Sequence, residues 1–298
     1  MREGFFDWWW YMSAVDKIFN LIRDTSTSLP EDVLKALASS SRKEGAGSSA
    51  AVVLKTIREN CALARKNALP ICQDTGTLTF FVDAALRSRV TPSVIRKAVQ
   101  RATKAGFLRR NAIDSIDGTS YDDNCAEGAP VIHYVEKGEV PGLPPRGVCL
   151  IMKGGGSENM SRQYSLPDDS LSAGRDMAGV KACLLDAVKK ILGYGCAPGI
   201  LGVCIGGDRA TGYETAKMQL FRPLDEKAPS STKTDKVLRK LEKEVLSEAN
   251  ALGIGPMGLG GRTTLLGVKA SSRARLPASF FVTVAYMCWA CRRRVTVI

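Results

Sequence analysis

A short polar segment, Pro70–Gly76 (PICQDTG), carries the first residues whose types and spacing could do chemistry. It sets Cys72, Gln73 and Asp74 side by side, immediately before a hydrophobic stretch. Such a tight polar turn is costly to bury unless it holds something. A thiolate is a good iron ligand, and Gln73 and Asp74 are suited to bind or deprotonate a substrate. A buried cysteine beside an ordinary Asp–Thr–Gly turn is the simpler interpretation of the segment taken alone.

A second segment, Lys153–Met160 (KGGGSENM), places three glycines after a predicted strand. Gly154, Gly155 and Gly156 leave their backbone amides open to the close approach of an anion, with Lys153 beside them. The segment is neither GxxxxGK[ST] nor GxGxxG, so neither nucleotide-binding motif applies. A flexible loop explains the composition equally well.

Two further segments carry cysteines at turns. In Gly193–Gly207 (GYGCAPGILGVCIGG), Cys196 lies in a Gly/Pro turn, whereas Cys204 lies within the following apolar run. The turn position suits a metal ligand and the strand position suits core packing. In Ala285–Arg294 (AYMCWACRRR), Cys288 follows a predicted strand, and a pair of packed thiols is the alternative there.

A glycine-dense segment, Gly253–Thr264 (GIGPMGLGGRTT), ends in Arg262 and two hydroxyls. An arginine can bind a carboxylate through two parallel hydrogen bonds. A solvated surface arginine is the alternative interpretation of Arg262.

Composition excludes several other classes of site. The chain has 298 residues and nine cysteines but a single histidine, His133, so the lone CxxC pair Cys288/Cys291 cannot complete a local zinc site. Disulfides are not expected, because nothing indicates secretion. The net charge of +12 comes from scattered lysines and arginines with no nucleic-acid recognition motif, so we expect no nucleic acid as partner. A positive field that attracts a dianionic substrate fits the same charge.

The elements that must position these residues alternate between helix and strand. Helices are predicted at Leu29–Ser40, Ala50–Asn67, Thr91–Ala105, Asp176–Ile191 and Asp235–Ala249. Apolar residues have helical spacing in the second, the fourth is amphipathic, and the last is a charged surface helix. Strands are predicted at Thr77–Ala84, Val131–Val135, Val148–Lys153, Leu201–Ile205, Thr263–Val268 and Ser279–Met287. Loops are expected at Ser39–Ser49 and at Asp225–Thr234, the second a minor boundary. The sequence therefore predicts a mixed α/β fold with its motifs on the turns.

The aromatic-rich N-terminus, Met1–Met12 (MREGFFDWWWYM), is a poor signal peptide because it carries charges and lacks an uninterrupted apolar core. We interpret residues 1–11 as a translational extension, with residues 1–28 forming an extension and leading helix and residues 29–298 the functional domain. No stretch reaches the length of a membrane helix, so we expect a cytoplasmic protein with no membrane partner.

Taken together, the motifs resemble the ordered signatures of the class I (iron–sulfur) fumarase family, alpha part. The resemblance is carried by PICQDTG, IMKGGGSENMS, GYGCAPGILGVCIGGDRATGYETAK, GIGPMGLGGRTTLLGVKA and LPASFFVTVAYMCWACRRR, from about Leu29 to the C-terminus. It implies the α/β fold of that alpha domain, with β-sheets flanked by helices. It also implies a hydro-lyase that adds water to, or removes it from, a small dicarboxylate.

The resemblance implies a 4Fe–4S cluster held by Cys72, Cys196 and Cys288, with the fourth iron open to substrate as a Lewis acid. The remaining six cysteines receive a structural interpretation: Cys61, Cys125, Cys149, Cys183, Cys204 and Cys291.

Substrate-binding positions of the family match Gln73, Asp74, Arg109 and Gly154–Gly156, with Gln73 and Asp74 in catalytic roles. Arg109 is a better match than Arg110. To these we add Lys153 and Arg262 as substrate-binding residues on their own chemistry. In this family a beta part, fused or separate, supplies further groups, so a beta subunit and a higher alpha–beta oligomer are implied.

Two departures from the family pattern concern the substrate. Relatives commonly carry a histidine just before the turn that here reads Arg275–Ser279, and many read NTGDNTP where this chain has Asn124–Pro130 (NCAEGAP). We expect hydration of fumarate to malate. The alternatives are the alpha subunit of an L(+)-tartrate dehydratase and a non-catalytic scaffold relative.

Overall fold

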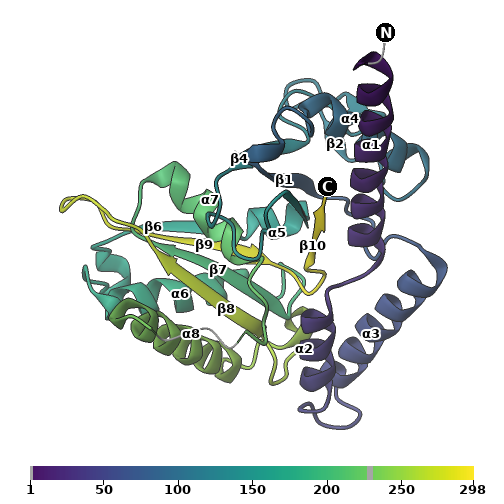
Figure 1. The fold of residues 1–298 in the computed structure, drawn as a ribbon. Coiled ribbons are helices and arrows are strands. Elements are labelled where there is room, and N and C mark those ends of the chain that lie inside the picture. Colours follow the sequence, from purple (N-terminus) through teal and green to yellow (C-terminus); the bar gives the residue numbers. More distant parts are fainter. Residues whose placement is uncertain (1–2, 227–230) are drawn as a thin grey trace. The chain divides into compact units, whose positions relative to one another are not determined.

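The chain folds into two compact units (Figure 1). The computed structural model describes residues 3–226 and 231–298, with side chains from residue 14 onward. Unit 1 comprises Met1–Pro30, Glu59–Gly155 and Ala290–Ile298, and unit 2 comprises Glu31–Arg58 and Gly156–Trp289.

Unit 1 is built on a four-stranded sheet with the order β10-β5-β1-β4. The central strand β1 (Thr77–Asp83) pairs antiparallel with β5 (Gly147–Lys153) and parallel with β4 (Val131–Val135). Strand β10 (Arg292–Val297) pairs antiparallel with the other edge of β5. A mixed sheet of this kind brings the start of β1 beside the end of β5, at the pair Thr77 and Lys153.

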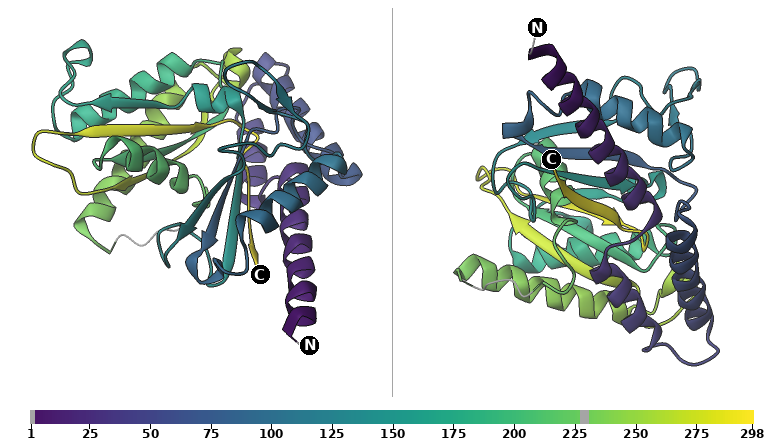
Figure 2. Two further views of the ribbon diagram at one scale, coloured as in Figure 1. Left: turned by 90° about the horizontal axis from the view of Figure 1, so that it is seen from above. Right: turned by 45° about the vertical axis from the view of Figure 1, so that its right-hand side comes forward.

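Two helices cover one face of this sheet, α1 (Glu3–Thr27) and α4 (Pro92–Lys104) (Figures 1 and 2). Alternate residues of a strand face the same side, and Leu78, Phe80 and Val82 of β1 accordingly enter one hydrophobic core with both helices. Helix α4 begins after Thr91, whose hydroxyl accepts a hydrogen bond from the Val94 N–H and so caps the helix. A two-stranded hairpin, β2 (Ala112–Ile113) and β3 (Ser120–Tyr121), completes the unit.

Unit 2 is built on a second four-stranded sheet with the order β6-β9-β7-β8. Its fully buried strand β7 (Gly199–Ile205) pairs parallel with β8 (Leu265–Ser272) and antiparallel with β9 (Phe281–Met287). Strand β6 (Arg162–Ser165) pairs antiparallel with β9 at the edge. The start of β7 therefore lies beside the end of β9, at the pair Ile200 and Met287.

Helices cover both faces of the second sheet (Figure 1). Helices α6 (Met177–Ile191) and α8 (Lys233–Ala251) share a hydrophobic core with Leu201 and Val203 of β7. Helix α7 (Arg209–Gln219) packs on the opposite face, where a side chain at Gly202 would overlap the Ala216 carbonyl. The shorter α2 (Glu31–Ser41) and α5 (Gly155–Asn159) and most of α3 (Ser49–Asn67) complete the helical elements.

The predicted α/β class is confirmed, and each predicted helix and strand is present within a few residues. Four expectations need correction. Helix α2 continues through Ser41, so the loop after it is shorter than predicted, and β8 continues to Ser272. Strand β10 was not predicted, because it begins with three consecutive arginines. Of the loop expected at Asp225–Thr234, residues 227–230 lie outside the described residues, and α8 begins within it at Lys233.

The division into residues 1–28 and 29–298 stays a prediction. The leading helix, α1, contributes to the core of unit 1, because Ala14, Val15 and Ile18 are fully or almost fully buried there. Ile18→Ala should therefore lower the free energy of unfolding by about 2–5 kcal/mol, the usual cost of truncating a packed core residue. The measurement is urea denaturation followed by circular dichroism.

The matched control is Lys17→Ala, one residue away and exposed, which should change stability by less than about 0.5 kcal/mol. Equal unfolding midpoints for the two variants would show that the leading helix is not part of the folded core.

Candidate functional site

The loop Cys72–Gly76 in unit 1 runs into β1 alongside the end of β5. Gly76 has φ 72°, and a Cβ there would lie 2.7 Å from the Gly154 N and still closer to the Lys153 carbonyl. Only glycine tolerates both the left-handed backbone and that approach. The pairing of β1 with β5 thus places the predicted cysteine loop directly against the predicted glycine loop.

Asp74 is held by three N–H donors at this junction. Its Oδ2 accepts a hydrogen bond from the Gly155 N–H at 2.8 Å, and its Oδ1 accepts from the Gly76 N–H at 2.9 Å and from the Asn111 amide at 3.3 Å. A Cβ at Gly154 would lie 2.6 Å from Oδ2, so glycine is required for this contact. The carboxylate is therefore fixed in orientation before any ligand arrives.

Arg109 and Arg110 point to different partners. Arg109 Nη1 makes a long hydrogen bond of 3.5 Å to Gln73 Oε1, and the Arg109 carbonyl accepts from the Thr75 hydroxyl at 2.8 Å. Arg110 instead pairs with Asp122 at 2.8 Å. Gln73 and both arginines are exposed. Of the two arginines, Arg109 is the one that the fold directs toward the Cys72–Gly76 loop.

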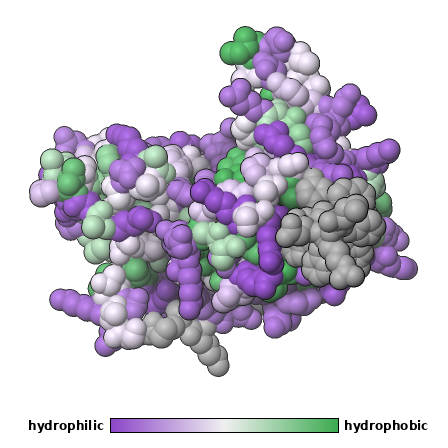
Figure 3. Space-filling model, turned by 45° about the horizontal axis from the view of Figure 1, so that its top comes forward, coloured by the Kyte–Doolittle hydropathy of each residue, from purple (hydrophilic) through white to green (hydrophobic). Residues whose placement is uncertain are grey.

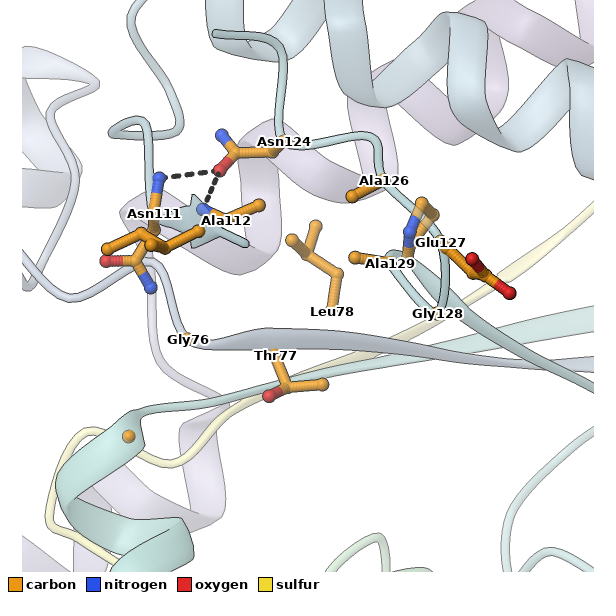
Figure 4. A pocket seen from close by; sticks show the side chains of 13 residues that line it. Gly76, Thr77, Leu78, Asn111, Ala112, Asn124, Ala126, Glu127, Gly128 and Ala129 are labelled. Carbon is orange, nitrogen blue, oxygen red and sulfur yellow. Dashed lines mark hydrogen bonds between the residues drawn. The ribbon is translucent and has the colours of Figure 1, made fainter. Parts of the chain in front are cut away.

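Asn124, which the sequence did not mark as a site residue, organises the Arg109–Ala112 segment (Figure 4). Its Oδ1 accepts hydrogen bonds from the backbone N–H groups of Asn111 and Ala112 at 2.7 and 3.2 Å, and its amide donates to the Arg109 carbonyl at 3.0 Å. Asn124 is buried with φ 59°, a conformation in which asparagine is enriched. Asn124 begins the NCAEGAP segment, which departs from the family pattern, and that position was the sequence feature that could have drawn attention to it.

A cavity of about 280 Å³ opens beside these residues (Figure 4). Its lining includes Gly76, Asn111 and Gly155, the three residues that donate to Asp74. The cavity therefore lies beside the residues that orient the Asp74 carboxylate, with backbone and amide groups on its wall that suit a polar ligand.

In unit 2, Cys196 and Cys288 lie at one end of the sheet. Cys196 precedes β7 and Cys288 follows β9, and the antiparallel pairing of these strands brings the two loops together. The Trp289 N–H donates to the Cys196 carbonyl at 3.3 Å, and the Cys288 N–H donates to the Ser157 hydroxyl at 3.2 Å. Cys196 is exposed with φ 54°, and Cys288 is half-buried.

Tyr286 lies behind these two cysteines and was not predicted. It is 1% exposed, and among the described residues its hydroxyl has no hydrogen-bond partner. Leaving a buried hydroxyl unpaired costs about 1–3 kcal/mol. Burial raises the pKa of Tyr286 well above its ordinary value, and the negative charge of Cys288 and Cys196 raises it further.

The cysteines with a structural interpretation differ from the three predicted ligands. Burial raises the thiol pKa of Cys149 to about 12, and mainly burial raises that of four others to about 11: Cys61, Cys125, Cys183 and Cys204. A metal binds the thiolate, so these environments oppose ligation. Cys291 is fully buried, whereas Cys72, Cys196 and Cys288 are at least partly exposed.

These observations fit an iron–sulfur cluster at the predicted cysteines. The donor set is thiols on loops, and in unit 2 the ring of Tyr286, whose hydroxyl has no partner among the described residues, packs against the loop that carries Cys196. Cys72 belongs to unit 1, and Cys196 and Cys288 belong to unit 2. Across residues 3–226 and 231–298, no three His, Cys, Asp or Glu side chains are gathered as a site for a metal ion.

The other predicted residues lie on the same loops or apart from them. Lys153 is fully buried at the end of β5, and Gly156 is exposed in α5. The Arg262 side chain is exposed, and its backbone N–H donates to both carboxylate oxygens of Glu44 at 2.9 and 3.0 Å. The assignment of all these residues to a substrate site stays a prediction.

No helix in the part of the chain that the structure describes is both long and apolar enough to cross a membrane. The face shown in Figure 3 is dominated by hydrophilic residues, with hydrophobic residues scattered among them.

The fold and these loops define a mixed α/β protein that presents cysteines and an oriented carboxylate at the ends of two sheets. The chain belongs to the fumarate hydratase (Fumerase) family, whose model matches residues 15–297. The resemblance inferred from the motifs is thereby confirmed, as is the expected class of enzyme, the hydro-lyases, at the level of the family.

Individual relatives carry two kinds of name. The chain is 47% identical over 283 residues to a protein of Geobacillus stearothermophilus provisionally named class I fumarate hydratase, covering 93% of this chain but only 53% of that protein. It is 32% identical over 292 residues to a Methanocaldococcus jannaschii protein provisionally named L(+)-tartrate dehydratase subunit alpha, covering 95% and 97% of the two chains. The L(+)-tartrate dehydratase subunit alpha of Escherichia coli K12 is 29% identical over 289 residues, covering 94% and 90%.

The thiol environments predict an order of chemical reactivity in the metal-free protein. At pH 8 a thiol of pKa about 12 is ionised to only about one part in ten thousand, so Cys149 should resist iodoacetamide. Cys196, exposed in its turn, should be alkylated first. Peptide mass spectrometry after brief labelling of native protein measures the order, with labelling in denaturant as the control. Early modification of Cys149 in native protein would contradict it.

Proposed function

We propose that this chain is the cluster-carrying alpha part of a hydro-lyase that interconverts fumarate and malate. Cys72, Cys196 and Cys288 would ligate a 4Fe–4S cluster. The observation that carries the proposal is the contrast among the cysteines. Five thiols are held protonated by their surroundings, whereas the three at the family motifs lie on loops at the ends of the two sheets.

When bound, the cluster would supply an iron that acts as a Lewis acid on the hydroxyl that leaves as water. The protein's own residues would bind and orient the dicarboxylate. Asp74 is already fixed by three N–H donors, so its carboxylate is available at a defined position to accept a proton. Preorganisation of this kind lowers the barrier because no reorientation is needed during reaction.

Charge and backbone dipoles would hold the substrate's carboxylates. Arg109 is exposed beside Gln73, and an arginine can bind a carboxylate through two hydrogen bonds. The exposed glycines Gly155 and Gly156 leave room for close approach of an anion. Buried Lys153 and exposed Arg262 are proposed as further substrate-binding residues. The net charge of +12 would attract a dianion to the site.

A beta part is proposed as the partner. The chain spans about half of the Geobacillus relative, whereas the two relatives that it covers almost fully are named as alpha subunits. Both facts suggest that a second part, fused or separate, completes the enzyme. We further propose a cytoplasmic alpha–beta assembly of more than one pair, with neither nucleic acid nor membrane as a partner.

L(+)-tartrate is the second candidate substrate. It is favoured by the near-complete coverage of the two tartrate dehydratase alpha subunits, whereas fumarate is favoured by the higher identity to the Geobacillus protein. Tartrate has one more hydroxyl than malate, so turnover of each by the chain with its partner separates the two. If the protein turns over neither substrate and binds no cluster, the interpretation as a non-catalytic scaffold is supported instead.

The cluster proposal predicts which cysteines hold iron. Anaerobically purified or reconstituted protein should contain about four irons and four acid-labile sulfides per chain, and Cys72→Ala, Cys196→Ala and Cys288→Ala should each lose most of them. Iron and sulfide analysis measures the content.

Cys291→Ala is the matched control, because it changes a buried cysteine three residues from Cys288 and should retain the cluster. Cys125→Ala is a second control at a half-buried position. Full loading of any of the three ligand variants, or an iron-free wild type after reconstitution, would contradict the proposal.

The substrate geometry predicts different effects for adjacent arginines. Arg109→Gln should raise KM for the dicarboxylate about tenfold to a hundredfold, because hydrogen bonds to a charged group contribute about 1.5–3 kcal/mol. Arg110→Gln, whose partner is Asp122, should leave KM nearly unchanged. Steady-state kinetics of the chain with its partner part measure both. Equal effects, or a larger effect at Arg110, would show that the assignment is off by one residue.

A further inference from the structure

The buried hydroxyl of Tyr286 lacks a partner that other buried tyrosines have. In unit 2, the Tyr164 hydroxyl donates to Asp186 Oδ2 at 2.8 Å. In unit 1, the Tyr134 hydroxyl donates to the Val90 carbonyl at 2.8 Å. No such acceptor is present for Tyr286 within the described residues, although it is more deeply buried than either. A buried donor in a native structure is normally paired, with protein, water or a bound group, so an unpaired one near predicted ligands marks a candidate contact to a bound group.

The position of this hydroxyl is fixed by packing. Tyr286 pairs in register with Leu201, and its backbone N–H donates to the Ser161 hydroxyl at 3.3 Å. The ring lies against Gly195 and Gly199, where any side chain would overlap it, and the phenol oxygen is over Gly199. These glycines flank Cys196 and begin β7, so the ring cannot turn its hydroxyl elsewhere without moving the cysteine loop.

The loop against which the Tyr286 ring packs carries Cys196, and Cys288 is two residues after Tyr286 in the sequence. Both cysteines are near enough to act electrostatically on the Tyr286 hydroxyl. Thiolate and sulfide sulfurs accept hydrogen bonds, and hydrogen bonds to the sulfurs tune an iron–sulfur cluster. A sulfur of a bound cluster is therefore a chemically suitable acceptor for the Tyr286 hydroxyl.

We propose that the Tyr286 hydroxyl donates a hydrogen bond to a sulfur of the cluster held by Cys196 and Cys288. Tyr286 is then a positioning residue that orients the cluster and sets its electronic properties, and this role rests on the proposed function. A hydrogen bond to sulfur stabilises the more negatively charged state, so its loss lowers the reduction potential of the cluster.

The test uses Tyr286→Phe, which removes only the hydroxyl, in anaerobically reconstituted protein of measured iron and sulfide content. Electron–nuclear double resonance of the reduced cluster, in water and in deuterium oxide, detects exchangeable protons near the iron. The wild type should show a strongly coupled exchangeable proton that Tyr286→Phe lacks, together with a lower reduction potential in the variant. An unchanged proton signal and potential in a fully loaded variant would overturn the inference.

Tyr164→Phe is the matched control, because it removes a buried hydroxyl of the same unit whose partner is Asp186. It should keep both the proton signal and the potential, and equal changes in the two variants would overturn the inference. If Tyr286→Phe does not retain the cluster, the infrared C–O band of Tyr286 in wild type decides. That band, assigned by its absence from metal-free Tyr286→Phe, should shift on cluster loading, and a constant band overturns the inference.

These outcomes separate the inference from the proposed function. A wild type that binds no cluster overturns the proposed function and the inference together. A wild type that binds the cluster, with no spectroscopic role for Tyr286, overturns the inference alone.

Discussion

The antiparallel pairing of Ile200 with Met287 is the contact on which the proposed cluster site in unit 2 depends. It places the start of β7 beside the end of β9, so the two loops that carry Cys196 and Cys288 meet at one sheet end. The register also sets Tyr286 behind them, with its ring against the glycines that flank Cys196. A slip by one residue would turn Tyr286 to the other face of the sheet and so take its buried hydroxyl away from this end of the sheet.

The same constraint operates in unit 1, where Thr77 pairs with Lys153. The pairing brings the Cys72–Gly76 loop against the Lys153–Gly155 loop, and glycine at both contacts lets backbone N–H groups reach the Asp74 carboxylate. In each unit, then, ordinary strand pairing positions residues that are far apart in the sequence. Most of the predicted site residues lie on loops next to the strand ends, and the sheets and their helices fix where those loops lie.

The sequence predicted the α/β class and most elements because their hydrophobic patterns are strong. It missed β10, since Arg292 and Arg293 look like surface residues but are 1% and 8% exposed in an edge strand. It named the cysteine, glycine and aspartate loops from their composition. It could not identify Asn124, whose role is a set of backbone hydrogen bonds made through the fold, or Tyr286, which occupies a strand position where any large apolar residue would fit the pattern. Both roles depend on which polar groups the fold pairs and which it leaves without a partner, and that is visible only in three dimensions.

The most direct test of the central claim is the Mössbauer spectrum of the chain purified with its partner part and loaded with the Mössbauer-active iron isotope. It should be recorded with and without fumarate. A cluster with three cysteine ligands has one iron that lacks a thiolate, so the account predicts that one of the four irons changes its spectrum when substrate is added while the other three do not. Four equivalent irons whose spectra do not change when substrate is added, or the absence of a cluster, would contradict it.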